Sequence, residues 1–205
     1  MLKRNFLIIL VFCSFLICIK NTSADYSEIT DKKTTFNLKA NEEGLSVYAT
    51  DLYFGSHELS SDDLNVPAEN DMIINITEVS GLRPGWKLKG KFDSFEDNGR
   101  SFDGASLFYP SVMPITTTGG EAVNKPPRLL DKNPSFIGNF KGTIITSGGA
   151  AEYLAEAKPG NGFGEWYLPY VDQERVQLKV PTGERSGNYE ARLTYTIESG
   201  PIAGQ

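Results

Sequence analysis

The feature that most constrains the fold of this chain is an apolar pattern with a period of two residues. Residues 176–180 alternate between apolar and polar side chains, and residues 189–197 do the same. Because successive side chains of a β-strand point to opposite faces of the sheet, this period indicates strands that each bury one face. Residues 181–187 lie between the two segments and are rich in turn formers, so the sequence predicts an antiparallel hairpin here.

Seven earlier segments also carry a strand pattern, and turn signals separate them. They are Thr35–Asn41, Leu45–Phe54, Met72–Val79, Trp86–Phe95, Ser106–Val112, Thr143–Ser147 and Gly164–Leu168. Asn98-Gly99 is a strong signal for a tight hairpin turn, and Pro84-Gly85 suits the centre of a type II turn. About nine or ten short strands with little or no helix predict an all-β fold, and we expect an antiparallel β-sandwich.

Two segments depart from the period of two. Ala150–Lys158 has helix propensity, but Pro159-Gly160 ends it within about two turns, so both states stay open and we favour a strand. The segment 116–139 is rich in proline and glycine and has no clear period. We expect it to be a long surface excursion inside the domain, and long excursions often carry function.

The N-terminus has the layout of a cleaved export signal. Two basic residues precede Phe6–Ile19, a run of fourteen residues without charge, and small residues follow at positions 22–24. Such a run is short for a membrane span, which needs about 20 apolar residues. Residues 1–24 are therefore predicted to be a signal peptide that is removed after Ala24. Residues 25–34 then form a short flexible N-terminal segment, and residues 35–205 form a single β-domain.

Removal of this leader changes the chemistry of the chain. Both cysteines, Cys13 and Cys18, leave with it, so the mature protein has no disulfide and no cysteine metal site. Three basic residues leave as well, which changes the formal net charge from −6 to −9. An acidic surface argues against nucleic acid as a partner. No second apolar stretch has membrane length, so we predict no direct membrane insertion.

The sequence offers little for catalysis. A nucleophilic triad needs a base beside the nucleophile, and His57 is the only histidine of the chain. Zinc catalysis normally requires three protein ligands, commonly histidines, and a chain with one histidine does not supply them. A glycosidase needs only two carboxylates, so a glycan hydrolase stays open as a distant alternative, with these candidates: Asp93, Glu96, Asp97, Glu165 and Asp172. We predict no catalytic residue, no bound metal and no cofactor.

The two tryptophans of the chain stand in matching contexts. Trp86 and Leu88 open one predicted strand, and Trp166 and Leu168 lie in another. Residues i and i+2 of a strand share a face, so each motif places an indole beside an isobutyl group. Two interpretations stay open: the pairs pack into the core, or the indoles form an exposed platform for sugar rings. We expect the two strands to lie close together, with at least one indole largely buried beneath the binding surface.

At these residues the chain resembles the WxL-domain family of Gram-positive surface proteins. The two Trp-x-Leu motifs stand in the family's order, eighty residues apart. The likeness begins near Asp51–Gly55, which is similar to an early family strand that ends in Phe-Gly. It closes on Gly187–Ile197, which is similar to the final family hairpin, and so covers most of the chain after the leader.

The resemblance implies a secreted, non-catalytic protein that attaches non-covalently to the Gram-positive cell wall. Its ligand would be peptidoglycan or another wall polysaccharide, bound through Trp86, Leu88, Trp166 and Leu168. The resemblance also implies a membrane-anchored surface protein and host matrix proteins as partners. A second function class therefore stays open, in which the protein is a subunit of a surface complex and is held to the wall or host matrix by a protein partner.

The leader generates the first testable prediction, a mature N-terminus at Asp25. N-terminal sequencing of protein from the wall and medium fractions is expected to begin Asp-Tyr-Ser, because the small residues before Asp25 suit signal peptidase. Surface-located protein that still begins at Met1 would contradict the cleavage.

Overall fold

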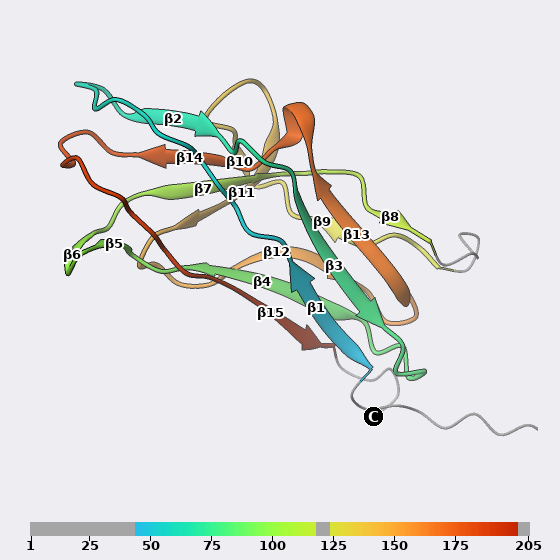
Figure 1. The fold of residues 1–205 in the computed structure, drawn as a ribbon. Coiled ribbons are helices and arrows are strands. Elements are labelled where there is room, and N and C mark those ends of the chain that lie inside the picture. Colours follow the sequence, from blue (N-terminus) through green and yellow to red (C-terminus); the bar gives the residue numbers. More distant parts are fainter. Residues whose placement is uncertain (1–43, 118–123, 201–205) are drawn as a thin grey trace, which may run out of the picture. The chain divides into compact units, whose positions relative to one another are not determined.

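Within residues 44–117 and 124–200, which the computed structural model describes, every regular element but one is a β-strand (Figure 1). The exception is η1, a single turn of 3-10 helix at Asp172–Glu174. In these residues no helix has the length and hydropathy that a membrane span requires. All of them belong to one unit of the chain, Lys39–Gln205. The predicted signal peptide, the segment 25–34 and the strand predicted at Thr35–Asn41 lie outside the described residues.

Sheet A is antiparallel and has the strand order β1-β3-β13-β8. Its strands are β1 Leu45–Ala49, β3 Met72–Glu78, β13 Gly164–Tyr170 and β8 Ile115–Thr116. Along β3, Ile74 and Ile76 are buried whereas Ile73 lies on the exposed side. The period of two in the sequence therefore predicted both the strand and the face that it buries.

Two further antiparallel sheets and a short ribbon complete the fold. Sheet B has the order β10-β11-β7-β14-β2, and sheet C has the order β15-β4-β12-β9. The strands of sheet B are β10 Asn133–Pro134, β11 Lys141–Thr146, β7 Ser106–Pro110, β14 Gln177–Val180 and β2 Leu64–Pro67. Those of sheet C are β15 Leu193–Ser199, β4 Trp86–Phe92, β12 Glu152–Ala157 and β9 Arg128–Leu129. The ribbon pairs β5 Phe95–Asp97 with β6 Arg100–Phe102.

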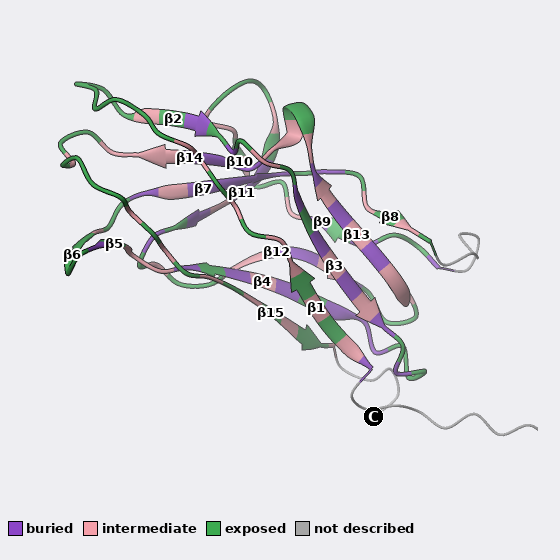
Figure 2. Ribbon diagram, viewed as in Figure 1, coloured by how far each residue is buried: buried purple, intermediate pink, exposed green. Residues whose placement is uncertain are grey.

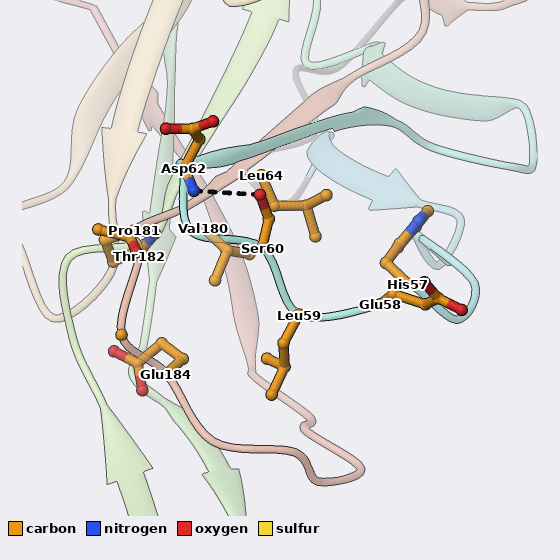
Figure 3. Close-up of a pocket in the computed structure, with 11 residues that line it drawn as sticks. His57, Glu58, Leu59, Ser60, Asp62, Leu64, Val180, Pro181, Thr182 and Glu184 are labelled. Carbon is orange, nitrogen blue, oxygen red and sulfur yellow. Dashed lines mark hydrogen bonds between the residues drawn. The ribbon is translucent and has the colours of Figure 1, made fainter.

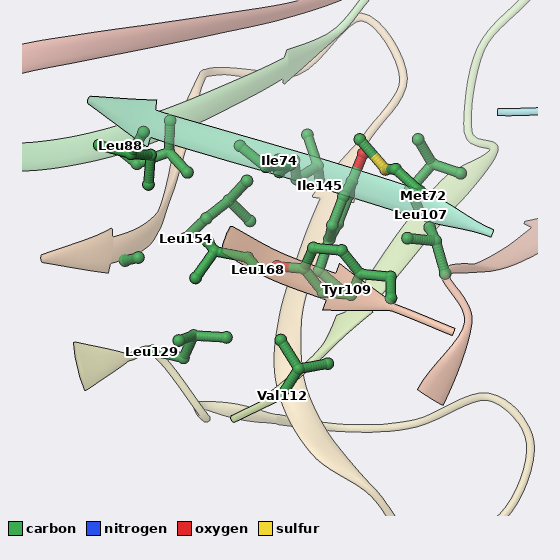
Figure 4. Packing of buried hydrophobic residues seen from close by; sticks show 14 of the residues in the cluster. Met72, Ile74, Leu88, Leu107, Tyr109, Val112, Leu129, Ile145, Leu154 and Leu168 are labelled. Atoms are coloured by element: carbon green, nitrogen blue, oxygen red, sulfur yellow. The ribbon is translucent and has the colours of Figure 1, made fainter. Parts of the chain in front are cut away.

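One apolar core lies between the three sheets. Among its fully buried members are Met72, Ile74, Leu88, Leu107, Ile145 and Leu168, which come from sheets A, B and C (Figure 4). Buried residues alternate with less buried ones along β3, β4 and β13 (Figure 2). This arrangement confirms the predicted all-β class and the antiparallel sandwich.

The predicted hairpin between residues 176–180 and 189–197 is wrong. β14 lies between β7 and β2 in sheet B, whereas β15 pairs with β4 at the edge of sheet C. Before β15 begins, the chain pairs with the ribbon: Glu190 and Glu96 exchange backbone hydrogen bonds of 2.8 and 3.0 Å. The ring of Tyr189 also packs edge-on against Phe102, with centroids 4.9 Å apart. A period of two predicts which face of a strand is buried, but not its partner.

Other local predictions agree with the structure. Asn98 and Gly99 have φ angles of 48° and 79°, as a two-residue type I′ hairpin turn requires, and they join β5 to β6. The segment Ala150–Lys158, open between helix and strand, contains the strand β12. The described residues hold fifteen strands rather than nine or ten. The additional ones are mostly two or three residues long, too short to show a period.

The segment 116–139 contributes an edge strand to each sheet. The strand β8, which ends at Thr116, closes one edge of sheet A, β9 closes an edge of sheet C, and β10 closes an edge of sheet B. An edge strand that is already paired on one side covers the backbone groups of its neighbour. The described parts of this segment therefore cover the more central strands β13, β12 and β11.

Three tyrosines, one from each sheet, meet in the core and form what we call the tyrosine cluster: Tyr109, Tyr170 and Tyr195. The hydroxyls of Tyr109 and Tyr195 share a hydrogen bond of 2.7 Å. The rings of Tyr109 and Tyr170 pack edge-on, with centroids 5.5 Å apart. Burial raises the pKa of all three hydroxyls well above the usual value of a tyrosine.

The tyrosine cluster predicts how stability depends on pH. Because the pKa of each hydroxyl is raised by folding, its contribution is fully present below the unfolded value of about 10 and is lost as the pH rises further. In an alkaline titration, part of the phenolate absorbance at 295 nm is expected to develop only when the circular dichroism signal of the strands is lost. Complete phenolate formation with the strand signal intact would contradict this burial.

Candidate functional site

Trp86 is fully buried at the start of β4. Its side chain is 0 % exposed, and its indole Nε1 donates a hydrogen bond of 2.8 Å to the carbonyl oxygen of Gly162. Leu88, two residues further along the same face, is also 0 % exposed. The first Trp-x-Leu motif therefore points into the core between the sheets.

Trp166 takes the equivalent position in β13 of sheet A. It is 2 % exposed, and its indole Nε1 donates a hydrogen bond of 3.0 Å to the carbonyl oxygen of Phe163. Leu168 beside it is fully buried. The two indoles thus bind adjacent carbonyls of one connection, residues 158–163 between β12 and β13, which we call the indole-held loop.

Further contacts fix the indole-held loop. The guanidinium of Arg83 lies 3.9 Å from the centroid of the Phe163 ring, and the Arg83 carbonyl accepts a hydrogen bond from the Gly160 amide. Asn124 donates a second hydrogen bond, of 2.7 Å, to the Phe163 carbonyl. Gly162 has a φ angle of 66°, and a Cβ there would lie 2.3 Å from that of Ala157. Only glycine fits this position without displacement of its neighbours.

The four residues that the sequence singled out are brought together in one core. All of Trp86, Leu88, Trp166 and Leu168 belong to the buried cluster. The burial of both indoles contradicts the interpretation that they form an exposed platform, and it agrees with core packing. Their role in binding stays a prediction; in this structure they hold the strands whose opposite faces meet solvent.

The middle residue of each motif points the other way. Lys87 lies on the outer face of sheet C, and Tyr167 lies on the outer face of sheet A. Because i+1 on a strand faces away from i and i+2, burying Trp and Leu forces the residue between them outward. In each motif, the buried Trp and Leu therefore fix the position of the outward residue between them.

The outer face of sheet C is charged, and most of its lysines have partners. Three lysines of β4 point outward: Lys87, Lys89 and Lys91. Lys89 lies 2.6 Å from Glu198, and Lys91 lies 3.0 Å from Asp93. The ammonium groups of Lys87 and Lys89 lie 5.4 and 4.7 Å from the centroid of the Tyr153 ring. This face therefore offers an anionic polymer little unpaired positive charge.

The outer face of sheet A is aromatic and nearly uncharged. The register pairs Tyr48 with Asn75, Asn75 with Tyr167, and Tyr167 with Ile115, so these residues form one row across four strands. Tyr48 is 69 % exposed and Ile115 is 53 % exposed. Ile73, at 39 % exposure, lies one row away. We define the outer face of sheet A by these residues: Tyr48, Ile73, Asn75, Ile115, Glu165 and Tyr167.

Hydrogen bonds order the polar side chains of this face. Asn75 donates a hydrogen bond of 3.0 Å from Nδ2 to Oε1 of Glu165. Together with the Tyr167 hydroxyl, the Asn75 amide holds the pKa of Glu165 below its usual range. The hydrogen bond between the Tyr167 hydroxyl and the Glu165 carboxylate raises the pKa of Tyr167. At neutral pH the face therefore presents an ionised carboxylate beside a protonated phenol.

Sequence reasoning did not select the outer face of sheet A. Tyr48, Asn75 and Tyr167 come from three distant segments, and only the strand register puts them in one row. The sequence did contain one signal for this face. If Trp166 and Leu168 are buried, the residue between them, Tyr167, must face away from the core.

The hollow between residues 57–64 and the turn after β14 has a volume of about 60 Å³ (Figure 3). Small-molecule sites usually measure about 300–1,000 Å³, so this hollow is too small for a sugar ring with its substituents. Figure 3 shows His57 and Glu58 on one side of it and Glu184 on the other. His57 Nε2 lies at hydrogen-bond distance from the Phe54 carbonyl, a backbone group rather than a nucleophile.

The candidate carboxylates are spread over several elements. Glu165 lies on sheet A and Asp172 lies in η1. Asp97 is buried and pairs with Arg100, while Asp93 pairs with Lys91. In the part of the chain that the structure describes, no three His, Cys, Asp or Glu side chains are grouped so that they could hold a metal ion.

Comparison with known proteins identifies one family. The model of the WxL domain, described as surface cell wall-binding, matches residues 20–201. No curated protein and no solved structure matches the chain.

The buried indoles generate a prediction about stability. Trp86→Ala or Trp166→Ala removes a large core side chain and leaves a cavity, which is expected to lower the free energy of unfolding by about 3–5 kcal/mol. Lys87→Ala, the neighbouring outward residue, is the control and should change it by less than about 0.5 kcal/mol. Thermal melting of the three variants and the wild type measures these changes in stability. Tryptophan variants that melt like the wild type would contradict the core role.

Proposed function

This chain belongs to the WxL domain family of surface cell wall-binding proteins, and we propose that it is an exported, non-catalytic protein that attaches non-covalently to the peptidoglycan of a Gram-positive cell wall. The observation that carries this proposal is the extent of the family match. It runs from residue 20 to residue 201 and so includes every described strand. The wall-binding domain therefore covers nearly the whole of this chain.

The distribution of charge supports attachment to the glycan rather than to anionic wall polymers. The chain has 26 acidic residues against 20 basic ones. On sheet C, Lys89 and Lys91 are paired with carboxylates. Long-range attraction to a polyanion requires unpaired positive charge. Sugar rings, in contrast, are bound by stacking on aromatic rings and by hydrogen bonds, neither of which needs a net positive charge.

A second function receives support from the sheet edges. β1, β2 and β15 stand at the ends of the strand orders of sheets A, B and C. An edge strand can pair with a strand of another protein. In this alternative the chain is a subunit of a surface complex, held to the wall or host matrix by a protein such as a membrane-anchored surface protein.

Binding to purified wall material tests the proposal. Sacculi are stripped of protein and of anionic polymers and then incubated with the mature protein, residues 25–205. Retention on sedimented sacculi is expected, because the proposed ligand is the glycan itself. Sacculi that carry their anionic polymers serve as the comparison, and their retention should be no greater.

Two results would contradict the proposal. Loss of retention on stripped sacculi, together with retention on intact cells, would favour the protein-partner alternative. Clearing of sacculi embedded in a renatured gel would reveal a hydrolase, against the non-catalytic role.

A further inference from the structure

The outer face of sheet A combines exposed aromatic rings, polar side chains and an antiparallel backbone. We propose that this face is the surface on which a wall glycan strand lies, with its sugar rings stacked on Tyr48 and Tyr167. This inference rests on the proposed function, because it assigns the wall ligand of the family to particular residues. The four residues of the Trp-x-Leu motifs do not touch the ligand in this arrangement.

The register sets the spacing of the two rings. Tyr48 and Tyr167 stand on β1 and β13, with Asn75 of β3 directly between them. Adjacent strands lie about 4.8 Å apart, so the two tyrosines are separated by roughly 10 Å across the sheet. An extended glycan that crosses the strands therefore meets an aromatic ring, then a polar side chain, then a second ring. Such a row suits a linear polymer better than a compact ligand.

Charge on this face favours a neutral ligand. The four strands of sheet A contain no lysine and no arginine. Their acidic residues are Glu165 on the outer face and Glu78, which is 2 % exposed and lies inward. A polyanion would meet only the negative charge of Glu165 here. The hydroxyl and acetamido groups of an uncharged sugar backbone can donate to this carboxylate instead.

The polar residues of the face are already held in place before a ligand arrives. Asn75 donates to Glu165, and the Tyr167 hydroxyl shares a hydrogen bond with the same carboxylate. Hydrogen-bonded and packed side chains lose little conformational entropy when a ligand binds. The carboxylate keeps its charge at neutral pH, because these bonds lower its pKa.

The core motif explains why the face is rigid. Trp166 and Leu168 are buried on either side of Tyr167 along β13, and Ile74 and Ile76 are buried on either side of Asn75 along β3. Each outward residue is thus fixed between two core residues of the same strand. The second Trp-x-Leu motif holds its middle residue at the surface and does not itself bind.

Substitutions on the two outer faces test the inference. Tyr48→Ala and Tyr167→Ala are each expected to weaken binding of mature protein to stripped sacculi by about tenfold, since each removes a stacking surface. Tyr48→Trp should bind as tightly as the wild type, because it keeps an aromatic ring on the exposed edge strand. Tyr153→Ala, which removes a tyrosine from the outer face of sheet C, is the matched control and should leave binding unchanged.

The outcomes separate this inference from the function on which it rests. If the wild type binds stripped sacculi and both alanine variants bind equally well, the inference is wrong while the wall-binding function stands. If the wild type itself is not retained, both are overturned. Melting temperatures of all variants accompany the binding data. A loss of binding in Tyr48→Ala at an unchanged melting temperature supports the inference, and Tyr48 suits this comparison because it is 69 % exposed.

A second readout distinguishes the glycan from other occupants of the face. Uncharged oligomers of N-acetylglucosamine are expected to displace the wild type from sacculi, whereas free stem peptides are not. Light scattering across a concentration series should show the molar mass of the monomer at every concentration. A dimer that Tyr48→Ala dissociates would assign the face to a second copy of the chain and overturn the inference.

Discussion

The rest of the structure depends on two hydrogen bonds from indole N–H groups, which connect sheets A and C to the same loop. Trp86 of sheet C and Trp166 of sheet A donate to the neighbouring carbonyls of Gly162 and Phe163. A buried indole N–H without an acceptor is unfavourable, so both sheets must keep their position relative to one loop. The spacing Trp-x-Leu follows from the same constraint, because a strand that buries an indole also buries the residue two positions on. The motif therefore packs into the core, and its role in binding stays a prediction.

The tyrosine cluster joins the same sheets at a second point and adds sheet B. Tyr109 and Tyr195 share a hydrogen bond between sheets B and C, and Tyr170 of sheet A packs against Tyr109. The indole hydrogen bonds and the tyrosine cluster together fix the inner faces of the sheets. The outer faces take no part in these contacts, and their side chains can therefore differ from sheet to sheet. One outer face presents paired charges and the other presents tyrosines, an asparagine and a carboxylate. One scaffold therefore has a charged side on sheet C and a largely uncharged side on sheet A, which is the side proposed to bind a neutral glycan.

The sequence predicted the strands well, because alternation of apolar and polar residues is a local property. It predicted the turn at Asn98-Gly99 for the same reason. Strand partners were not predictable, since register depends on contacts across many residues, and the hairpin expected after residue 180 was wrong. For the indoles, the sequence left core packing and an exposed platform open and predicted that at least one is largely buried; the structure buries both. A half-buried and a fully buried strand start have the same pattern, so the sequence alone could not decide between the two interpretations. The row from Tyr48 to Ile115 needed the register of four strands, so no motif revealed it.

The order in which strands pair also affects when the chain can fold. Trp86 pairs with Ser199, Glu78 with Gly164, and Leu64 with Val180, so each sheet joins an early strand to a late one. Sheet C has no complete form until residues 193–199 have left the ribosome, and pairings over such distances close slowly. None of the three sheets can be completed until its late strand has been made, which is compatible with the proposed export of a chain that has not yet folded. The strand order that builds the domain thus also ties completion of sheet C to the synthesis of β15.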